Sequence, residues 1–259
     1  MGVMSDDQVA KSKQLIINLF YANVKGKKAD TSMSNIKHDG KSGHWLETQM
    51  GIIHNGDNAP DLFGFEMKNN TSNKTTFGDW SADYYIFSKE SRYGITRDEF
   101  LQIFGKPNAE KNGRFSWSGQ PTPTIKGFNA FGQKLSIDEE KNIIAIYSYD
   151  QDKRLDKSTI VPITLRQNNL VLARWDADRI RSKLESKFNQ NGWFKCLTNA
   201  DGVYTEIVFG EPMDYDNWLE LVKTGDVFFD SGMYQGNNRP YSQWRATNGL
   251  WNKLITSRY

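Results

Sequence analysis

The stretch NAPDLFGFEMKN, residues 58–69, places three charged side chains in a segment that otherwise has the pattern of a β-strand. Strand side chains alternate between the two faces of a sheet, so Glu66 and Lys68 should project together while Phe65 and Met67 point to the other face. Asp61 lies five residues before Glu66, so a regular strand would turn it away. Only a bend near Pro60 or Gly64 would bring the two carboxylates together, and glycine makes such a bend easy.

Two carboxylates and one ammonium on a shared face suit chemistry on a phosphate group. Asp61 and Glu66 offer oxygen ligands for a hard cation such as Mg²⁺, which keeps several waters and is held by one or two carboxylates plus substrate phosphate. Lys68 could orient or activate the attacking water and offset phosphate charge. The alternative is a partly exposed strand with an ordinary surface ion pair, worth about 0–1 kcal/mol. The short pattern D-x4-E-x-K does not by itself decide between them.

Length and composition bound the kind of protein. A chain of 259 residues can build one large body or two closely packed lobes around a buried core. Its single cysteine, Cys196, cannot pair within the chain, which favours a reducing compartment. We find no basic segment followed by an apolar run at the N-terminus, and no apolar stretch of about 18 residues. We therefore expect a soluble, intracellular protein without a membrane span.

The charges are segregated along the chain. Residues 151–200 hold ten Lys and Arg against five acids, residues 201–230 hold eight acids against one lysine, and residues 231–259 hold four basic residues and no acid. Solvated faces would explain such blocks. A polyanion-binding cleft with protected flanks would have the same pattern.

Hydrophobic periodicity and turn residues predict interleaved helices and strands. We expect helices over 5–24, 43–51, 97–104, 176–190 and 214–225, strands over 60–69, 82–88 and 226–232, and hairpins over 135–150 and 192–209. The Asn-, Thr- and Ser-rich segment between 69 and 82 is expected to be a loop, and 114–133 a loop with a possible edge strand. This order predicts an α/β or α+β body, with a mixed central sheet flanked by helices.

The region 41–77 resembles the active site of nucleases with the PD-(D/E)XK core. Pro60-Asp61 and Glu66-Met67-Lys68 match that motif residue by residue, and Glu47 stands where the family has an acid on the preceding helix. More narrowly, the order G-x-x-x-E, A-P-D and E-hydrophobic-K is similar to the MvaI/BcnI-like type II restriction endonucleases, the MutH-related branch. The resemblance spans most of residues 40–250. This chain keeps Trp244-Arg245 near the C-terminus but has no histidine there, which departs from the family pattern.

The resemblance implies a PD-(D/E)XK core with a second, recognition lobe. Roughly 1–110 would form mainly the catalytic lobe, and roughly 111–259 would complete the sheet and recognise DNA. The implied activity is Mg²⁺-dependent hydrolysis of double-stranded DNA at a short site, leaving 5′-phosphate and 3′-hydroxyl ends. Asp61 and Glu66 would bind the metal, Lys68 would act on water and phosphate, and Glu47 would add to the metal site or hold Lys68 in place.

The same resemblance implies a monomer in the cytoplasm of a prokaryote. A cognate DNA methyltransferase is expected genetically rather than as a bound subunit. Two other functions stay open. One is a MutH-like mismatch-repair nickase, which would cut one strand and need an activating partner. The other is a non-catalytic DNA-binding protein, in which the charged strand has no chemical role.

Two groups of residues are candidates for DNA contact. Arginine suits bidentate contacts with guanine, and Asn or Gln suits adenine, which points to the segment NNRPYSQWRA and its residues Arg239, Tyr241, Gln243 and Arg245. Phosphate contacts are expected from Arg174, Arg179 and Arg181. The alternatives are a surface cation–π pair between Arg245 and Trp244, and ion pairs of the other arginines with acids of their own helix.

Overall fold

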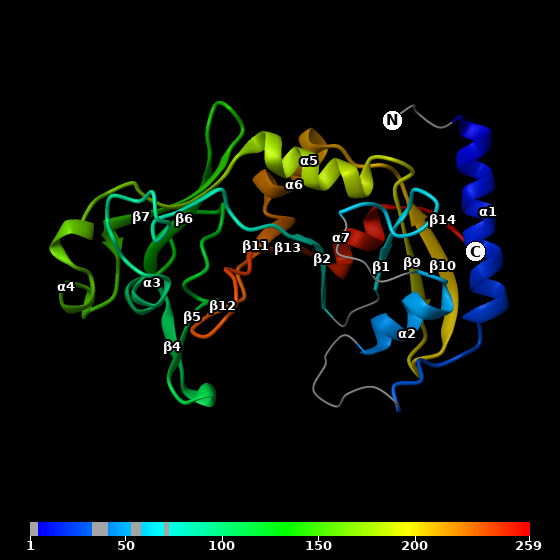
Figure 1. Cartoon of the computed structure of the whole chain (residues 1–259), viewed down its shortest axis with the longest axis horizontal. Helices are drawn as coiled ribbons and strands as arrows, with labels where there is room; N and C mark the ends of the chain where they lie inside the picture. Colours follow the sequence, from blue (N-terminus) through cyan, green and yellow to red (C-terminus); the bar gives the residue numbers. More distant parts are fainter. Residues whose placement is uncertain (1–4, 33–40, 53–57, 70–72) are drawn as a thin grey trace. The chain divides into compact units, whose positions relative to one another are not determined.

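The structure is a computed structural model and describes residues 5–32, 41–52, 58–69 and 73–259. It confirms the mixed α+β class (Figure 1). The helices are α1 (Asp6–Asn23), α2 (Lys41–Gln49), α3 (Arg97–Phe104), α4 (Lys157–Ile160), α5 (Ala177–Phe188), α6 (Tyr215–Thr224) and α7 (Asn248–Lys253), with short 3-10 turns at Ala109–Lys111 and Ile163–Leu165.

Strands are distributed over several small sheets. They are β1 (Glu66–Lys68), β2 (Lys74–Asp79), β3 (Tyr84–Tyr85), β4 (Lys106–Asn108), β5 (Arg114–Trp117), β6 (Phe131–Ile137), β7 (Ile143–Asp152), β8 (Leu170–Trp175), β9 (Trp193–Thr198), β10 (Tyr204–Gly210), β11 (Val227–Asp230), β12 (Met233–Tyr234), β13 (Gln243–Thr247) and β14 (Ile255–Arg258). The sheet orders are β1-β9-β10-β14, β11-β13-β2, β12-β5-β4 and β3-β8-β7-β6.

The chain divides into two compact units, each built from separate segments. Unit 1 comprises Met1–Thr75, Lys183–Tyr215 and Thr247–Tyr259, and unit 2 comprises Thr76–Ser182 and Asp216–Ala246. The lobes expected from the sequence, roughly 1–110 and 111–259, are continuous segments, whereas these units are not. Which functional lobe corresponds to which part of the chain stays a prediction. Among the described residues, no helix is long and apolar enough to cross a membrane.

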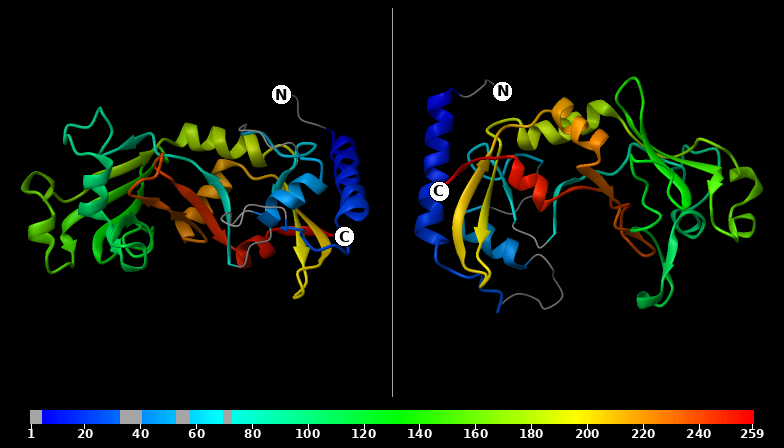
Figure 2. Two further views of the ribbon diagram at one scale, coloured as in Figure 1. Left: turned by 60° about the horizontal axis from the view of Figure 1, so that its bottom comes forward. Right: turned by 180° about the vertical axis from the view of Figure 1, so that it is seen from behind.

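Unit 1 is organised around one face of its four-stranded sheet. Helix α1 begins with a capping box in which Ser5 and Gln8 bond reciprocally. Its buried residues, including Phe20, pack in one apolar cluster with Phe65 and Met67 of the charged stretch. Figure 2 shows α1 running alongside β9 and β10. The apolar side of the stretch is therefore the buried anchor that alternation predicts.

The opposite face of this sheet carries the charged residues. β1 runs parallel to β9, in the register Glu66 to Trp193 and Lys68 to Lys195. β9, β10 and β14 are antiparallel. Trp193 packs edge-on against Trp251 of α7 on this side. Glu66 and Lys68 thus project toward the side where α7 lies, away from α1.

Unit 2 has an aromatic core of edge-to-face and tilted ring contacts. Trp117, Trp175 and Trp244 are fully buried and meet around Phe229. Helix α3 begins with a capping box between Thr96 and Glu99. Gly105 ends that helix, which confirms the expected bounds 97–104.

Several elements differ from the expectation. The expected strand 60–69 is regular only from Glu66, and 82–88 pairs only at Tyr84–Tyr85. The expected loop before Trp80 contains β2, in which Thr75 and Phe77 point inward. Its Asn, Thr and Ser neighbours concealed this alternation. Elements β13, α7 and β14 also have no counterpart in the sequence-based assignment.

Gly192 fixes the junction that aligns β1 with β9, and its replacement provides a stability test. Its φ is +92°, its carbonyl accepts from the Glu66 N–H at 3.0 Å, and a Cβ there would lie 2.2 Å from the Gly210 carbonyl oxygen. Gly192→Ala should destabilise the fold by roughly 3 kcal/mol. Gly202→Ala is the control because its φ of +78° imposes similar strain in open space, at about 1 kcal/mol. Equal losses in chemical denaturation would contradict this assignment.

Candidate active site

A tight turn brings Asp61 back toward the strand. Leu62 and Phe65 exchange both backbone hydrogen bonds, at 3.0 and 2.9 Å. Phe63 and Gly64 between them have φ values of 48° and 82°. Two consecutive positive φ angles are typical of a two-residue hairpin turn, whose second position favours glycine. The bend that the two carboxylates require is therefore present.

Asn191 fixes this turn from the segment before β9. Its side-chain amide donates to the Phe63 carbonyl at 2.9 Å, and its backbone N–H donates to the Gly64 carbonyl at 3.0 Å. A Cβ at Gly64 would lie 2.6 Å from the Asn191 amide nitrogen. The turn thus needs glycine both for its backbone angle and for this close approach.

The turn places the Asp61 carboxylate on the backbone of β1. Asp61 Oδ2 accepts from the Met67 N–H at 2.8 Å. The residue as a whole is exposed to solvent, yet its carboxylate packs against the chain. Partial burial and the negative charge of Glu66 raise the pKa of Asp61 to about 6, against the opposing hydrogen bond from Met67. The charge of Glu66 contributes to this rise because the two acids lie close together.

Glu66 is the buried centre of the site. It is 2% exposed, and its Oε1 accepts from Lys68 Nζ at 2.8 Å and from Lys187 Nζ at 2.9 Å. Burial alone would raise the pKa of Glu66, but the charges of the two lysines outweigh it and hold this pKa below its ordinary value. Glu66 Oε2 is buried and has no hydrogen-bond partner among the described residues.

Lys187 was not anticipated from the sequence. It lies in the last turn of α5, 121 residues from Glu66 along the chain, and no local pattern links the two. The next residue, Phe188, packs its ring against Lys68, with Nζ 5.0 Å from the ring centroid. The end of α5 therefore covers the charged face of β1 with one cation and one aromatic ring.

Glu47 lies on α2, which approaches the end of β1. A Cβ on Gly43 would lie 2.4 Å from the Asn69 amide nitrogen, so the helix and the residue after Lys68 are in close contact. Gly43 and Glu47 are four residues apart and share a helix face. Glu47 also lies 3.6 Å from the ring of the exposed His44. A role of Glu47 at the metal or at Lys68 stays a prediction.

The acids of the site suit a cation that keeps much of its water. Within the described part of the chain, no three His, Cys, Asp or Glu residues cluster closely enough to hold a metal ion together. Asp61 and Glu66 are two carboxylates, which is the number that Mg²⁺ commonly takes from a protein. The buried Glu66 Oε2 is a hard oxygen without a hydrogen-bond partner in the part of the chain that the structure describes. The residues present therefore fit a Mg²⁺ site.

The candidate base-reading residues lie in unit 2, on and before β13. Arg239 donates to Asp79 at 2.9 Å and stacks over Tyr241, whereas Arg245 lies 3.3 Å from Asp230. Trp244 is fully buried in the aromatic core. The alternative of a surface cation–π pair with Arg245 is therefore wrong. Gln243 and Arg245 project from the face of β13 opposite to Trp244.

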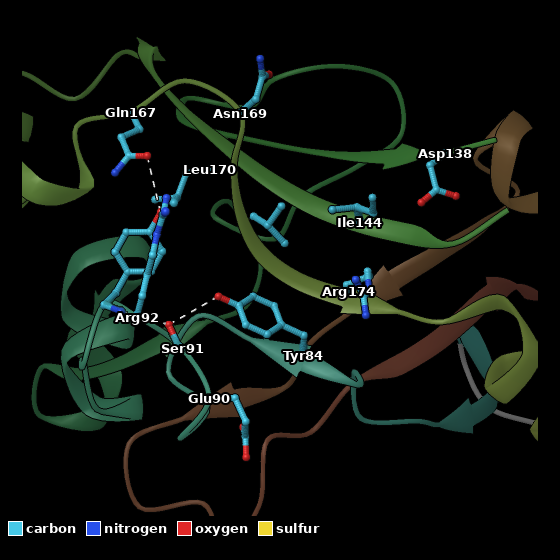
Figure 3. A pocket seen from close by; sticks show the side chains of 12 residues that line it. Tyr84, Glu90, Ser91, Arg92, Asp138, Ile144, Gln167, Asn169, Leu170 and Arg174 are labelled. Carbon is cyan, nitrogen blue, oxygen red and sulfur yellow. Dashed lines mark hydrogen bonds between the residues drawn. The ribbon is translucent and has the colours of Figure 1, made fainter. Parts of the chain in front are cut away.

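The three candidate phosphate contacts also have acidic partners. Arg174 donates to Asp176 at 2.7 Å, Arg179 to Asp83 at 3.1 Å, and Arg181 lies 3.8 Å from Asp216. Only the first partner belongs to the acids expected beside α5, and the other two come from distant segments. Arg174 also lines an open hollow of about 570 Å³ on the β3-β8-β7-β6 sheet (Figure 3). None of Asp61, Glu66 and Lys68 lines that hollow.

Comparisons with known proteins each match a restriction endonuclease. The model of the LlaMI restriction endonuclease family matches residues 24–259. The chain is 49% identical to the type II restriction enzyme ScrFI of Lactococcus lactis subsp. cremoris, over 95% of this chain and 97% of that protein. Its fold is similar to that of restriction endonuclease MvaI in complex with cognate DNA substrate, with a TM-score of 0.59 and 14% identity over 99% of this chain and 98% of that one.

The raised pKa of Asp61 predicts a pH-dependent stability difference. Its folded value of about 6 lies above the ordinary 3.8, so the folded state holds more protons between these values. Asp61 should therefore destabilise the fold progressively as pH rises from about 4 to about 6. Asp61→Asn should remove this effect and keep an acceptor for the Met67 N–H. Without divalent cations, the thermal midpoint of the variant relative to wild type should rise across this window and then level off.

Asp30→Asn is the matched control for this measurement. Hydrogen bonds from Ser32 hold the pKa of Asp30 below its ordinary value, which is opposite in direction to the shift of Asp61. Its midpoint difference from wild type should stay flat between pH 5 and 7.5. A flat difference for Asp61→Asn as well would mean that burial and the charge of Glu66 do not raise the pKa of Asp61.

Proposed function

The chain belongs to the LlaMI restriction endonuclease family, and from this premise we propose that Asp61, Glu66 and Lys68 carry out its DNA cleavage with Mg²⁺. It is a type II restriction endonuclease, an enzyme that cleaves double-stranded DNA at a specific site. The observation that carries the catalytic assignment is the pair of carboxylates. Glu66 bonds the Lys68 ammonium through Oε1 and has a second oxygen without a partner among the described residues, while Asp61 folds back onto the Met67 N–H of the same strand.

The reaction that this geometry supports is hydrolysis of a phosphodiester. A water oxygen forms a bond to phosphorus, the bond to the 3′ oxygen breaks, and the proton ends on that oxygen, leaving a 5′-phosphate and a 3′-hydroxyl. Bound Mg²⁺ would polarise a phosphate oxygen and lower the pKa of its water. Asp61 Oδ1 and Glu66 Oε2 would hold it. Lys68 and Lys187 would offset the charge that develops on the phosphate.

The charges in the site favour an anionic substrate. Two ammonium groups, those of Lys68 and Lys187, each lie within 3 Å of Glu66 Oε1. An isolated buried carboxylate would be costly, and this one is compensated before substrate arrives. Coordination of a cation by Glu66 would release part of the lysine charge toward the phosphate. Lys68 would then be placed to orient the attacking water.

We further propose that the enzyme acts as a monomer in the bacterial cytoplasm, with a cognate methyltransferase as a separate protein. Arg239, Tyr241, Gln243 and Arg245 would read bases, and Arg174, Arg179 and Arg181 would contact phosphates. Their ion pairs do not oppose this assignment. Arg174, Arg179 and Arg239 are each about half exposed, and such pairs contribute about 0–1 kcal/mol, so DNA could replace the acids.

Cleavage of plasmid DNA tests the catalytic assignment. With Mg²⁺ and no other protein, the wild type should give discrete fragments, and a chelator should stop the reaction. Asp61→Ala and Lys68→Ala should lower the rate by at least about 100-fold because each removes charge used in the transition state. DNA binding should remain in a gel-shift assay. Lys11→Met, which removes an exposed lysine of α1, is the control and should cleave normally.

Three other outcomes would point elsewhere. Nicks confined to one strand of hemimethylated sites, together with dependence on an activating protein, would favour the MutH-like alternative. Full activity of both alanine variants would exclude this catalytic set. Metal-independent binding without scission under any divalent cation would favour a non-catalytic role. Sequencing of the fragment ends would also give the recognition site and the stagger.

Base-reading and phosphate-contacting arginines should respond differently to substitution. Arg245→Ala should weaken discrimination at one base pair by about 1–3 kcal/mol, because it would remove contacts to a base edge. Arg174→Ala should weaken binding to all sequences about equally and lower the salt dependence of binding by about one ion. Affinities for cognate and single-substituted duplexes at several salt concentrations measure both. Equal effects of the two variants on cognate and substituted sites would contradict the division of roles.

A further inference from the structure

A second lysine, Lys195, lies beside Lys68 inside the sheet. The two residues are register partners on the parallel strands β1 and β9. Side chains in register project from the same face, so both ammonium groups lie on the charged side of the sheet. Both are buried, Lys68 at 8% exposure and Lys195 at 1%. Like charges on neighbouring strands normally destabilise a sheet.

The surroundings of Lys195 do not neutralise it. Its Nζ donates to the Thr75 hydroxyl and to the Asn248 side-chain oxygen, each at a long 3.4 Å. No carboxylate forms an ion pair with it in the described structure. Burial and the charge of Lys68 lower the pKa of Lys195 to about 8. Near pH 7, Lys195 is therefore still protonated in most molecules. A buried cation with only long, neutral hydrogen bonds is costly to the fold.

A charge that destabilises the fold in this way is expected where function requires it. Thr75 and Asn248 confine Lys195, whereas Lys68 extends to Glu66 and over the ring of Phe188. Repulsion between the two ammonium groups therefore acts on Lys68 and drives it toward Glu66. The same fixed charge adds positive potential behind the position of the phosphate.

We propose that Lys195 is a positioning residue for DNA hydrolysis: its buried charge holds the Lys68 ammonium against Glu66 and toward the bound phosphate. This inference rests on the proposed role of Lys68 in cleavage. Lys195 touches neither Asp61 nor Glu66 in the described contacts, so it acts through Lys68 and through its field.

Two substitutions abolish the uncompensated charge in different ways: one removes it and the other pairs it with a carboxylate. Lys195→Met keeps the length and apolar stem of the side chain. Asn248→Asp leaves Lys195 in place and gives it a carboxylate 3.4 Å away, while retaining an acceptor for the Thr75 hydroxyl. Its position in the first turn of α7 also favours an acid. Lys11→Met removes the same charge from an exposed position of unit 1 and serves as the control.

The test combines single-turnover cleavage, DNA affinity without divalent cation, and the thermal midpoint. Lys195→Met and Asn248→Asp should each lower the single-turnover rate by about tenfold or more, because the field on Lys68 and the phosphate is lost. Affinity for cognate DNA should change by less than about twofold, as expected for a group that does not contact DNA. The thermal midpoint should rise in both variants. Removal of a residue that stabilises the fold would lower it instead. Lys11→Met should match wild type in all three.

The outcomes separate this inference from the catalytic assignment. If Lys68→Ala abolishes cleavage but Lys195→Met cleaves at the wild-type rate, only the role of Lys195 is excluded. If Lys68→Ala cleaves normally, the catalytic assignment itself fails. A lowered midpoint with a rate loss that follows the unfolded fraction would make Lys195 a structural residue. A slow Lys195→Met with a normal Asn248→Asp would assign the effect to side-chain shape and overturn the proposal.

Discussion

The buried carboxylate of Glu66, held by the ammonium groups of Lys68 and Lys187, is the interaction on which the site depends. Removing either partner of a buried ion pair is strongly destabilising, since it leaves an uncompensated charge. This ion pair therefore holds the short strand β1 against the end of α5, and the bond from Met67 to Asp61 holds it against the preceding turn. The Glu66 N–H bond to the Gly192 carbonyl supplies the other constraint, because it sets the register against β9.

Much of the local structure follows from the sequence because its causes are local. The capping box at Ser5, the ends of α3 and the facing of Phe65 and Met67 depend on residues at most a few positions apart. The bend before Glu66 was also predictable, as a requirement of the chemistry. Lys187 and Lys195 were not, because they reach the site from segments more than 100 residues away. The inward alternation of β2 was hidden by its polar neighbours.

Unit 1 concentrates several departures from ordinary protein stability on one side of β1. Asp61 has a raised pKa, Glu66 Oε2 has no partner among the described residues, and the buried Lys195 has only neutral acceptors. Each feature alone lowers the stability of the fold, and together they suit a site that binds a cation and a phosphate. The candidate DNA contacts of unit 2 differ, because their charges are already paired with acids. Because exposed ion pairs contribute little to the stability of the fold, DNA could replace these acids at a small cost in free energy.

The central claim is that Asp61 and Glu66 hold the divalent cation. Its most direct test is Mn²⁺ binding in the presence of duplex DNA, measured by electron paramagnetic resonance. The wild type should bind the ion, and Glu66→Gln should lower its affinity by about 100-fold or more while DNA affinity is retained. Equal Mn²⁺ affinity of the two proteins would contradict the assignment.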